Sequence, residues 1–262
     1  MSLLAWIVLF CLLGGVLSVL AAAVFLVFSE SLRNDLLPHL VSFATGTLLG
    51  AALLGLLPHA LAGAAGGDTH AIPLAVLLGL LGFFLLEKLV LWRHCHADHC
   101  EVHVPDTHDD HLQHRSTGTL ILIGDGLHNF LDGILIAGAF LTDIHLGIVT
   151  SLAVVAHEIP QEVGDFAVLL HSGFTRGRAF LYNVLSSLTT VVGGVLAWMA
   201  LQEMEAVLPF VLAVAASSFI YIAVADLIPT LHRRVEGTAT LQQVILIAIG
   251  VLLIYATHST LH

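Results

Sequence analysis

Eight long apolar stretches dominate this chain of 262 residues, and they leave few folds open to it. A helix of about 20 apolar residues crosses the roughly 30 Å core of a bilayer, and most of these stretches are at least that long. They are Leu3–Phe28, Leu37–Leu61, Ile72–Trp92, Leu120–Leu141, Leu146–Leu170, Ala179–Leu201, Ala206–Ile228 and Leu241–Ala256. Hydrophobic residues make up 58% of the chain and charged residues only 10%. The sequence therefore predicts an all-α polytopic membrane protein with eight transmembrane helices.

The positions of the basic residues predict how these helices are oriented. All eight Lys and Arg residues lie in or beside alternate links: Arg33, Lys88, Arg93, Arg115, Arg176, Arg178, Arg233 and Arg234. By the positive-inside rule these four links face the cytoplasm, and an even number of helices then places both termini outside. The eight helices fill residues 1–262, so we expect a single membrane transport domain.

A short echo in the sequence suggests an internal repeat. Leu56-Leu-Pro58-His59 ends the second apolar stretch, and Leu227-Ile-Pro229 ends the seventh, which runs in the opposite direction. An inverted repeat of helices one to three and six to eight would leave the fourth and fifth between them, a 3+2+3 arrangement found in transporters. A shared proline that ends a helix is the simpler alternative.

The longest link, residues 94–116, is rich in metal-ligating side chains. It holds seven histidines, two cysteines and five acids, without apolar periodicity. We expect a cytoplasmic loop that is disordered without a ligand and that binds metal by exchangeable ligand sets. Its expected ligands are His94, Cys95, His96, His99, Cys100, His103, His108, His111 and His114.

Two polar strings interrupt the fourth and fifth apolar stretches. On a helix, positions 125, 128, 129 and 132 share an arc of about 100°, and positions 157, 158, 161, 162 and 165 one of about 140°. Ionisable groups at membrane depth indicate an ion pathway, although a satisfied buried polar network is the alternative. Imidazole with carboxylate suits a divalent transition metal. The expected ligands are His128, Asn129, Asp132, His157, Glu158, Gln161 and Glu162, with Asp125 and Asp165 along the pathway.

Within this set two positions for metal are expected. His128, Asp132 and His157 would supply two imidazoles and a carboxylate. Asn129, Glu158 and either Gln161 or Glu162 could form a second, harder position beside it.

These strings resemble a known family. HNFLDG at 128–133, followed by HEIPQEVGDF at 157–166, is similar to the ZIP (Zrt/Irt-like) divalent metal transporters, in the branch with HNFxDG and HExPxExGD motifs. The resemblance extends over nearly the whole chain. It implies zinc as the usual substrate, movement toward the cytoplasm, and a metal site between the fourth and fifth helices. The residues it implies are His128, Asn129, Asp132, His157 and Glu158, with His59 and Asp226 in the pathway and Asp125 matching this branch.

One position departs from the family pattern. Many members have His or Glu after the proline of the fifth helix, where this chain has Gln161, a weak neutral ligand. The number of metals held at one time is therefore left open.

Other functions are less well supported. An intramembrane zinc metalloprotease needs HExxH, whereas this chain reads His157-Glu158-Ile-Pro-Gln161 and lacks the second histidine. We therefore expect no enzyme and no cofactor, with Zn²⁺ as bound substrate and iron, manganese or cadmium as alternatives. The expected partners are divalent metal ions and the lipid bilayer, with a homodimer as candidate assembly. No basic patch for nucleic acid exists, and the expected location is a bacterial inner membrane.

Overall fold

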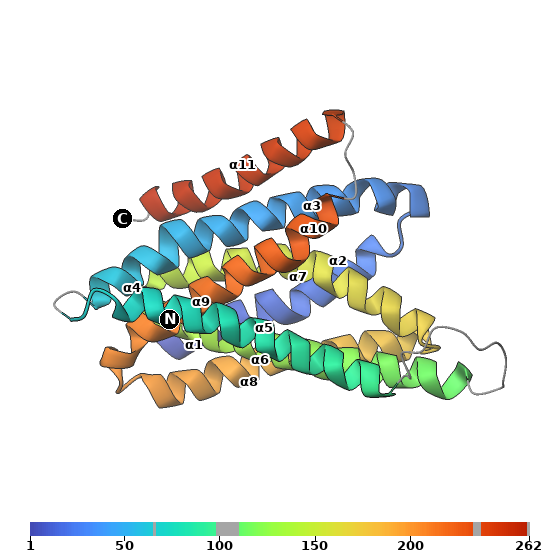
Figure 1. The fold of residues 1–262 in the computed structure, drawn as a ribbon, viewed down its shortest axis with the longest axis horizontal. Helices are drawn as coiled ribbons and strands as arrows, with labels where there is room; N and C mark the ends of the chain where they lie inside the picture. Colours follow the sequence, from blue (N-terminus) through green and yellow to red (C-terminus); the bar gives the residue numbers. More distant parts are fainter. Residues whose placement is uncertain (65–66, 98–109, 233–236, 261–262) are drawn as a thin grey trace.

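The computed structural model describes residues 1–64, 67–97, 110–232 and 237–260, and within these ranges the regular secondary structure is entirely helical. The helices lie side by side in one elongated bundle (Figure 1). Their bounds are α1 Leu3–Leu12, η1 Leu13–Leu17, α2 Ser18–Phe25, α3 Glu30–Gly50, η2 Ala51–Leu56, α4 Leu57–Gly63, α5 Ala71–Ala97, α6 Asp110–Thr142, α7 Ile144–His171, α8 Arg176–Leu201, η3 Glu205–Val207, α9 Leu208–Tyr221, η4 Ile222–Leu227, α10 Ile228–Leu231 and α11 Gly237–Thr260.

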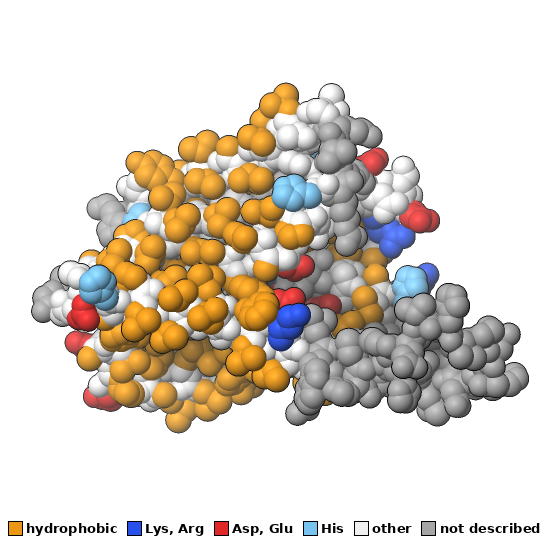
Figure 2. Space-filling model, in the orientation of Figure 1, with side chains coloured by type: hydrophobic (Ala, Val, Ile, Leu, Met, Phe, Trp, Pro, Cys, Tyr) orange, Lys and Arg blue, Asp and Glu red, His pale blue; other side chains and the backbone are white. Residues whose placement is uncertain are grey.

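Each expected transmembrane stretch corresponds to one helix or to helices joined end to end. In the described part of the chain, seven such runs are long and apolar enough to cross a membrane. The remaining one, α7, has 28 residues and carries Glu158, Glu162 and Asp165. Six leucines of α5 are each more than half exposed: Leu74, Leu77, Leu78, Leu81, Leu85 and Leu89. Figure 2 shows hydrophobic side chains over most of one face, which suits contact with lipid tails.

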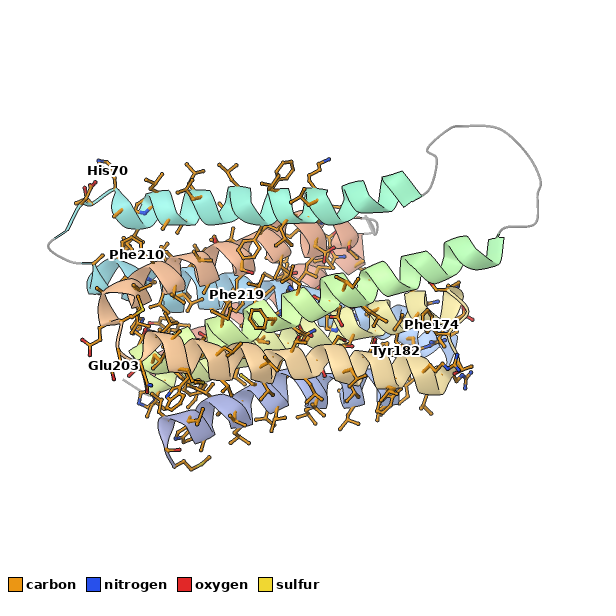
Figure 3. The ribbon with its side chains drawn as sticks, turned by 90° about the horizontal axis from the view of Figure 1, so that it is seen from below. His70, Phe174, Tyr182, Glu203, Phe210 and Phe219 are labelled. Carbon is orange, nitrogen blue, oxygen red and sulfur yellow. The ribbon has the colours of Figure 1, made fainter. Side chains whose placement is uncertain are left out.

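The two ends of the bundle differ in charge. The first described residue lies toward the left in Figure 1, whereas the first turns of α3, α6, α8 and α11 lie toward the right. Arg33 and Arg176 stand in the first turns of α3 and α8, at that right end. Figure 3 places His70 and Glu203 at the opposite end. The end that bears the basic links is called the basic end below, and the other the terminal end.

The pairs of helices that pack together are those expected if passes one to three and six to eight form an inverted repeat: the second pass packs on the eighth and the third on the seventh. α11 packs along α3, while α5 packs along α9. α7 contacts the first of these pairs, α6 contacts the second, and α6 and α7 contact each other. The two similar sequence strings that suggested the repeat also share a local structure. Six-residue π-helices, η2 and η4, precede Pro58 and Pro229 by the same spacing. A proline lacks the N–H that an α-helix needs, so a local change in hydrogen bonding at both places follows from the sequence.

Close backbone contact joins α6 to α8. A Cβ at Gly133 would collide with the carbonyl oxygen of Thr190, and one at Gly193 with that of Phe130. Small residues permit such an approach between membrane helices. The crossing lies near His128 and Asp132, so it positions the helix that carries three of the seven expected metal ligands.

The histidine-rich tract is partly helical, which corrects the expectation of a loop over residues 94–116. α5 continues through Ala97 and α6 begins at Asp110. Extending an existing helix costs far less than nucleating one, which explains why the helices continue into the polar tract. His94, Cys95 and His96 are in the last turns of α5, and His111 and His114 in the first turns of α6. His99, Cys100, His103 and His108 lie outside the described residues.

Candidate metal centre

Four of the expected ligands meet between α6 and α7. One ligand atom from each of His128, Asp132, His157 and Glu158 lies within 4.8 Å of all the others. Only Asp143 separates α6 from α7, so the two helices are neighbours. The carboxylate of Asp143 caps α7 by accepting from the backbone N–H groups of His145 and Leu146. Spacing of four residues brings His128 and Asp132 to one face of α6. The adjacent residues His157 and Glu158 both reach this face from α7.

The distances are those of a compact cluster. The Nε2 of His157 lies 3.3 Å from Oδ2 of Asp132 and 3.5 Å from Oε1 of Glu158. The Nε2 of His128 lies 3.3 Å from the same Glu158 oxygen and 3.3 Å from Nε2 of His157. Nδ1 of His157 donates to the carbonyl oxygen of Ala153 at 3.0 Å, so the neutral ring presents Nε2 to the cluster.

The cluster is buried, and no Lys or Arg whose side chain the structure describes forms an ion pair with it. The side chains of Asp132, His157 and Glu158 are each 1% exposed and that of His128 is 22% exposed. Among the described residues, the carboxylate oxygens of Asp132 and Glu158 have no hydrogen-bond partner beyond these imidazole contacts. Two buried carboxylates against two neutral imidazoles carry a formal charge that a divalent cation offsets, and leaving them unpaired would be costly.

Asn129 does not join this cluster, because its amide is held by other residues. Its Oδ1 accepts from Thr190 at 2.9 Å and its Nδ2 donates to Oδ1 of Asp125 at 2.8 Å. The second carboxylate oxygen of Asp125 accepts from Ser186 at 2.5 Å. Thr190, Asn129, Asp125 and Ser186 thus form a buried hydrogen-bonded chain between α6 and α8, called the α6–α8 network below.

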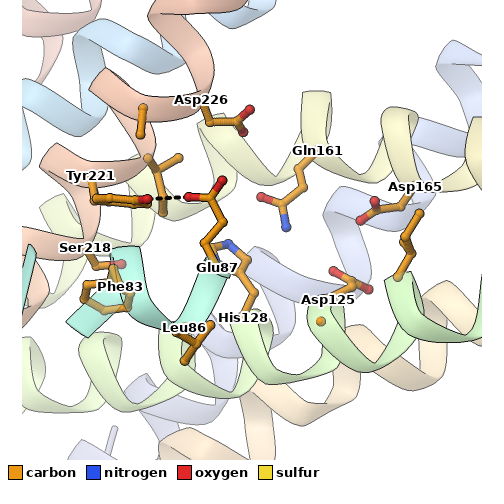
Figure 4. Close-up of a pocket in the computed structure, with 14 residues that line it drawn as sticks. Phe83, Leu86, Glu87, Asp125, His128, Gln161, Asp165, Ser218, Tyr221 and Asp226 are labelled. Atoms are coloured by element: carbon orange, nitrogen blue, oxygen red, sulfur yellow. Dashed lines mark hydrogen bonds between the residues drawn. The ribbon is translucent and has the colours of Figure 1, made fainter. Parts of the chain in front are cut away.

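A cavity of about 410 Å³ leads away from His128. In α6 its lining extends from His128 back to Ile121, and in α7 from Gln161 on to Asp165, so it runs toward the basic end. Asp125, Asp165 and Asp226 line it, as expected of pathway residues, together with Glu87. Figure 4 shows these acids around the cavity, where the hydroxyl of Tyr221 donates to Glu87.

The other expected residues have different surroundings. Glu162 is fully buried, belongs neither to the four-residue cluster nor to the cavity lining, and has no hydrogen-bond partner among the described residues. His59 lies at the terminal end, where it lines a second cavity with Leu141, Thr142 and Glu205.

Sequence reasoning missed the residues that surround the expected ligands. Ser186 and Thr190 belong to the string Ser-Ser-Leu-Thr-Thr at 186–190, in the middle of the apolar helix α8. Hydroxyls at that depth usually bond to the preceding turn, so the string alone does not indicate contact with α6. Glu87 stands beside Lys88 in the third apolar stretch and was not among the predicted pathway residues.

Comparison with known proteins identifies the family to which the chain belongs. A family model described as "ZIP Zinc transporter" matches residues 2–257. The chain is 32% identical to zinc transporter ZIP13 of Pongo abelii over 227 residues, 82% of this chain and 65% of that protein. It is 34% identical to zinc transporter YKE4 of Saccharomyces cerevisiae over 237 residues, 80% of this chain and 67% of that protein.

A third relative is matched over less of its length. The chain is 39% identical to zinc transporter ZIP10 of Danio rerio over 150 residues, 54% of this chain and 18% of that protein. The chain thus spans less than two thirds of ZIP10 and of ZIP13. All three relatives are eukaryotic, so they do not support the expected bacterial membrane. The match to the family model over nearly the whole chain is decisive: the chain belongs to the ZIP zinc transporter family.

Proposed function

We propose that this chain carries a divalent transition metal, zinc above all, across the membrane toward the basic end through His128, Asp132, His157 and Glu158. The observation that carries the proposal is the meeting of these four ligand atoms within 4.8 Å, from two helices that are long enough to span a bilayer. Two imidazoles with two carboxylates are a ligand set that suits zinc. The printed names of the three relatives also mention zinc.

The cavity supplies a route between the centre and one side of the membrane. It extends from His128 toward the basic end, which the positive-inside rule assigns to the cytoplasm. Asp165 and Asp226 line this route and offer weaker, exchangeable oxygen ligands to a departing metal. Conduction requires that an ion can leave its site as well as enter it.

We infer one metal at this centre in the conformation described. The amide oxygen of Asn129 is engaged by Thr190, and Glu162 lies outside the four-residue cluster. Gln161 lines the cavity but is neutral. The second, harder position considered from the sequence therefore lacks an assembled ligand set here.

Family membership also bears on the metalloprotease alternative. The matched family consists of transporters, and the second histidine required for HExxH is absent. Iron, manganese and cadmium remain competing substrates, because imidazole with carboxylate does not distinguish them strongly.

Zinc uptake into proteoliposomes tests the proposal. His128→Ala and His157→Ala each remove an imidazole from a four-ligand site, so we expect uptake to fall by about tenfold or more. His171→Ala is the matched control. Like His157, His171 lies on α7 and its Nδ1 bonds the carbonyl oxygen four residues earlier, but its side chain is exposed. Near wild-type uptake by both site variants, with normal folding, would refute the proposed centre.

A further inference from the structure

A second pair of histidines lies at the terminal end of the bundle. His59 belongs to α4 and His258 to the last turn of α11, and their ring centres are 5.4 Å apart with the ring planes at 73°. The rings of His128 and His157 in the metal centre are 5.5 Å apart at 80°. Two positions far apart in the sequence thus repeat the imidazole arrangement of the candidate metal centre.

This spacing suits a shared metal. With zinc–nitrogen distances of about 2.0–2.1 Å, two imidazoles on one tetrahedral ion have ring centres about 5 Å apart. The Nδ1 of His59 lies 2.8 Å from the carbonyl oxygen of Gly55. A carbonyl can only accept, so Nδ1 carries the proton and the neutral ring of His59 presents Nε2, as His157 does.

The surroundings give a metal access to His59, one member of this pair. His59 is half-buried and lines the cavity of about 480 Å³ that Glu205 also lines. Asp68, Glu203 and Glu205 are exposed in the links at this end, where Figure 3 places His70 and Glu203. Acids of one sign raise the local concentration of a divalent cation.

We propose that His59 and His258 form a two-imidazole binding site for a divalent metal at the terminal end, separate from the buried centre. Water completes the coordination, so binding is weaker and exchange faster than at the four-residue centre. The proposal's capture role rests on the proposed function, since metal bound here would be supplied to the transport route from the outside. The binding itself does not depend on transport.

The first test measures binding without the other sites. The background protein carries His128→Ala and His157→Ala, and a glycine–serine linker replaces residues 94–116. In detergent, Co²⁺ titration followed by visible absorption should reveal one bound ion per chain, displaced by Zn²⁺. Adding His258→Ala or His59→Ala should abolish this signal. His39→Ala is the control, because His39 bonds the carbonyl of Asp35 in the same way but lies on α3 near the basic end.

The second test measures uptake in the otherwise unchanged protein. Losing an outer-shell partner already costs about 10–100-fold in metal affinity, so losing one of two ligands should cost no less at this site. The proposed site captures metal for the transport route and takes no part in the rate-limiting passage through the buried centre. His258→Ala should therefore raise the half-saturating zinc concentration about threefold or more and leave the maximal rate nearly unchanged. Melting temperature checks that each variant is folded.

Each outcome bears on the proposal. If the background protein binds no Co²⁺, or binds it equally after His59→Ala and His258→Ala, the two rings only pack and the site does not exist. If His39→Ala abolishes the signal as well, the binding is not specific to the pair, and the proposal again fails. A protein that binds Co²⁺ at the pair yet takes up no zinc would keep this site and overturn the transport function instead.

Discussion

Gln161 lines the cavity that also contains His128, Asp125 and Asp165. Gln161→Glu would add a carboxylate there, four residues after His157. We expect tighter zinc binding, by about tenfold or roughly 1.4 kcal/mol, or a second metal per chain. The maximal uptake rate should stay the same or fall, because a more tightly held ion leaves more slowly. Equilibrium binding in detergent and uptake in proteoliposomes measure the two effects.

A charge-matched control separates the local effect from a change in net charge. Gln202→Glu adds the same charge at an exposed position at the terminal end, outside both described cavities. It should leave affinity and metal count unchanged. Unchanged affinity and stoichiometry for Gln161→Glu would mean that position 161 does not act on the bound metal.

At the residue scale, spacing predicted some contacts and missed others. His128 and Asp132 are one helical turn apart, as the cluster requires, because side chains four residues apart project together. The same periodicity placed Asn129 on the polar stripe, but could not tell which neighbour its amide would meet. A short amide near the edge of a stripe can turn to either adjacent helix, and here it bonds to α8.

The α6–α8 network links a helix of the metal centre to its neighbour. Thr190→Val keeps the side-chain volume but removes the hydroxyl that donates to Oδ1 of Asn129. A buried acceptor left without its donor costs about 1–3 kcal/mol, so we expect lower thermal stability. Uptake should also fall, because Asn129 no longer holds Asp125 at the cavity wall. Melting temperature and initial uptake rate measure the two effects.

Thr190→Ser is the matched control, since it retains a hydroxyl at the same position. It should restore most of the stability and uptake lost by the valine variant. Equal behaviour of the serine and valine variants would show that volume at position 190, and not the hydrogen bond, is what matters.

At the element scale, apolar length predicted each pass but not its inner detail. π-helical segments interrupt the first, second and seventh passes. Where such a segment forms depends on how neighbouring helices satisfy the hydrogen bonds of the backbone. Pro58 and Pro229 marked two of these places in advance, because proline removes a backbone donor wherever it stands. The segment at Leu13–Leu17 has no such residue and could not be predicted.

For the whole molecule, the cavity predicts one-sided access. In a protein without its native cysteines, Ala225→Cys should react with a membrane-impermeant thiol reagent only from the cytoplasmic side, because Ala225 lines the cavity toward the basic end. Ala206→Cys, which lines the cavity at the terminal end, should react only from outside. Labelling of sealed and inside-out vesicles distinguishes the two sides. The reverse pattern would contradict the orientation predicted from the basic links.

The histidine-rich tract should store metal rather than conduct it. Replacing residues 94–116 with a short flexible linker removes seven histidines and two cysteines. We expect uptake to remain measurable while the metal bound per chain falls, because the tract is polar and lies beyond the apolar spans. Metal analysis and uptake of the same preparation test this. A folded but inactive variant would place the tract in the pathway, and an unchanged metal content would exclude metal binding by it.

By itself the sequence determined the helical passes and the two polar stripes that carry the candidate metal ligands, and it predicts the orientation of the passes. These follow from apolar length, charge asymmetry and helical periodicity, all of which are local properties of the chain. Only the tertiary structure decided that Asn129 bonds to Thr190, that Glu87 lines the same cavity as Asp226, and that His59 lies against His258. Each of these contacts joins helices that are distant in sequence, and their relative rotation and depth depend on side-chain packing across the whole bundle.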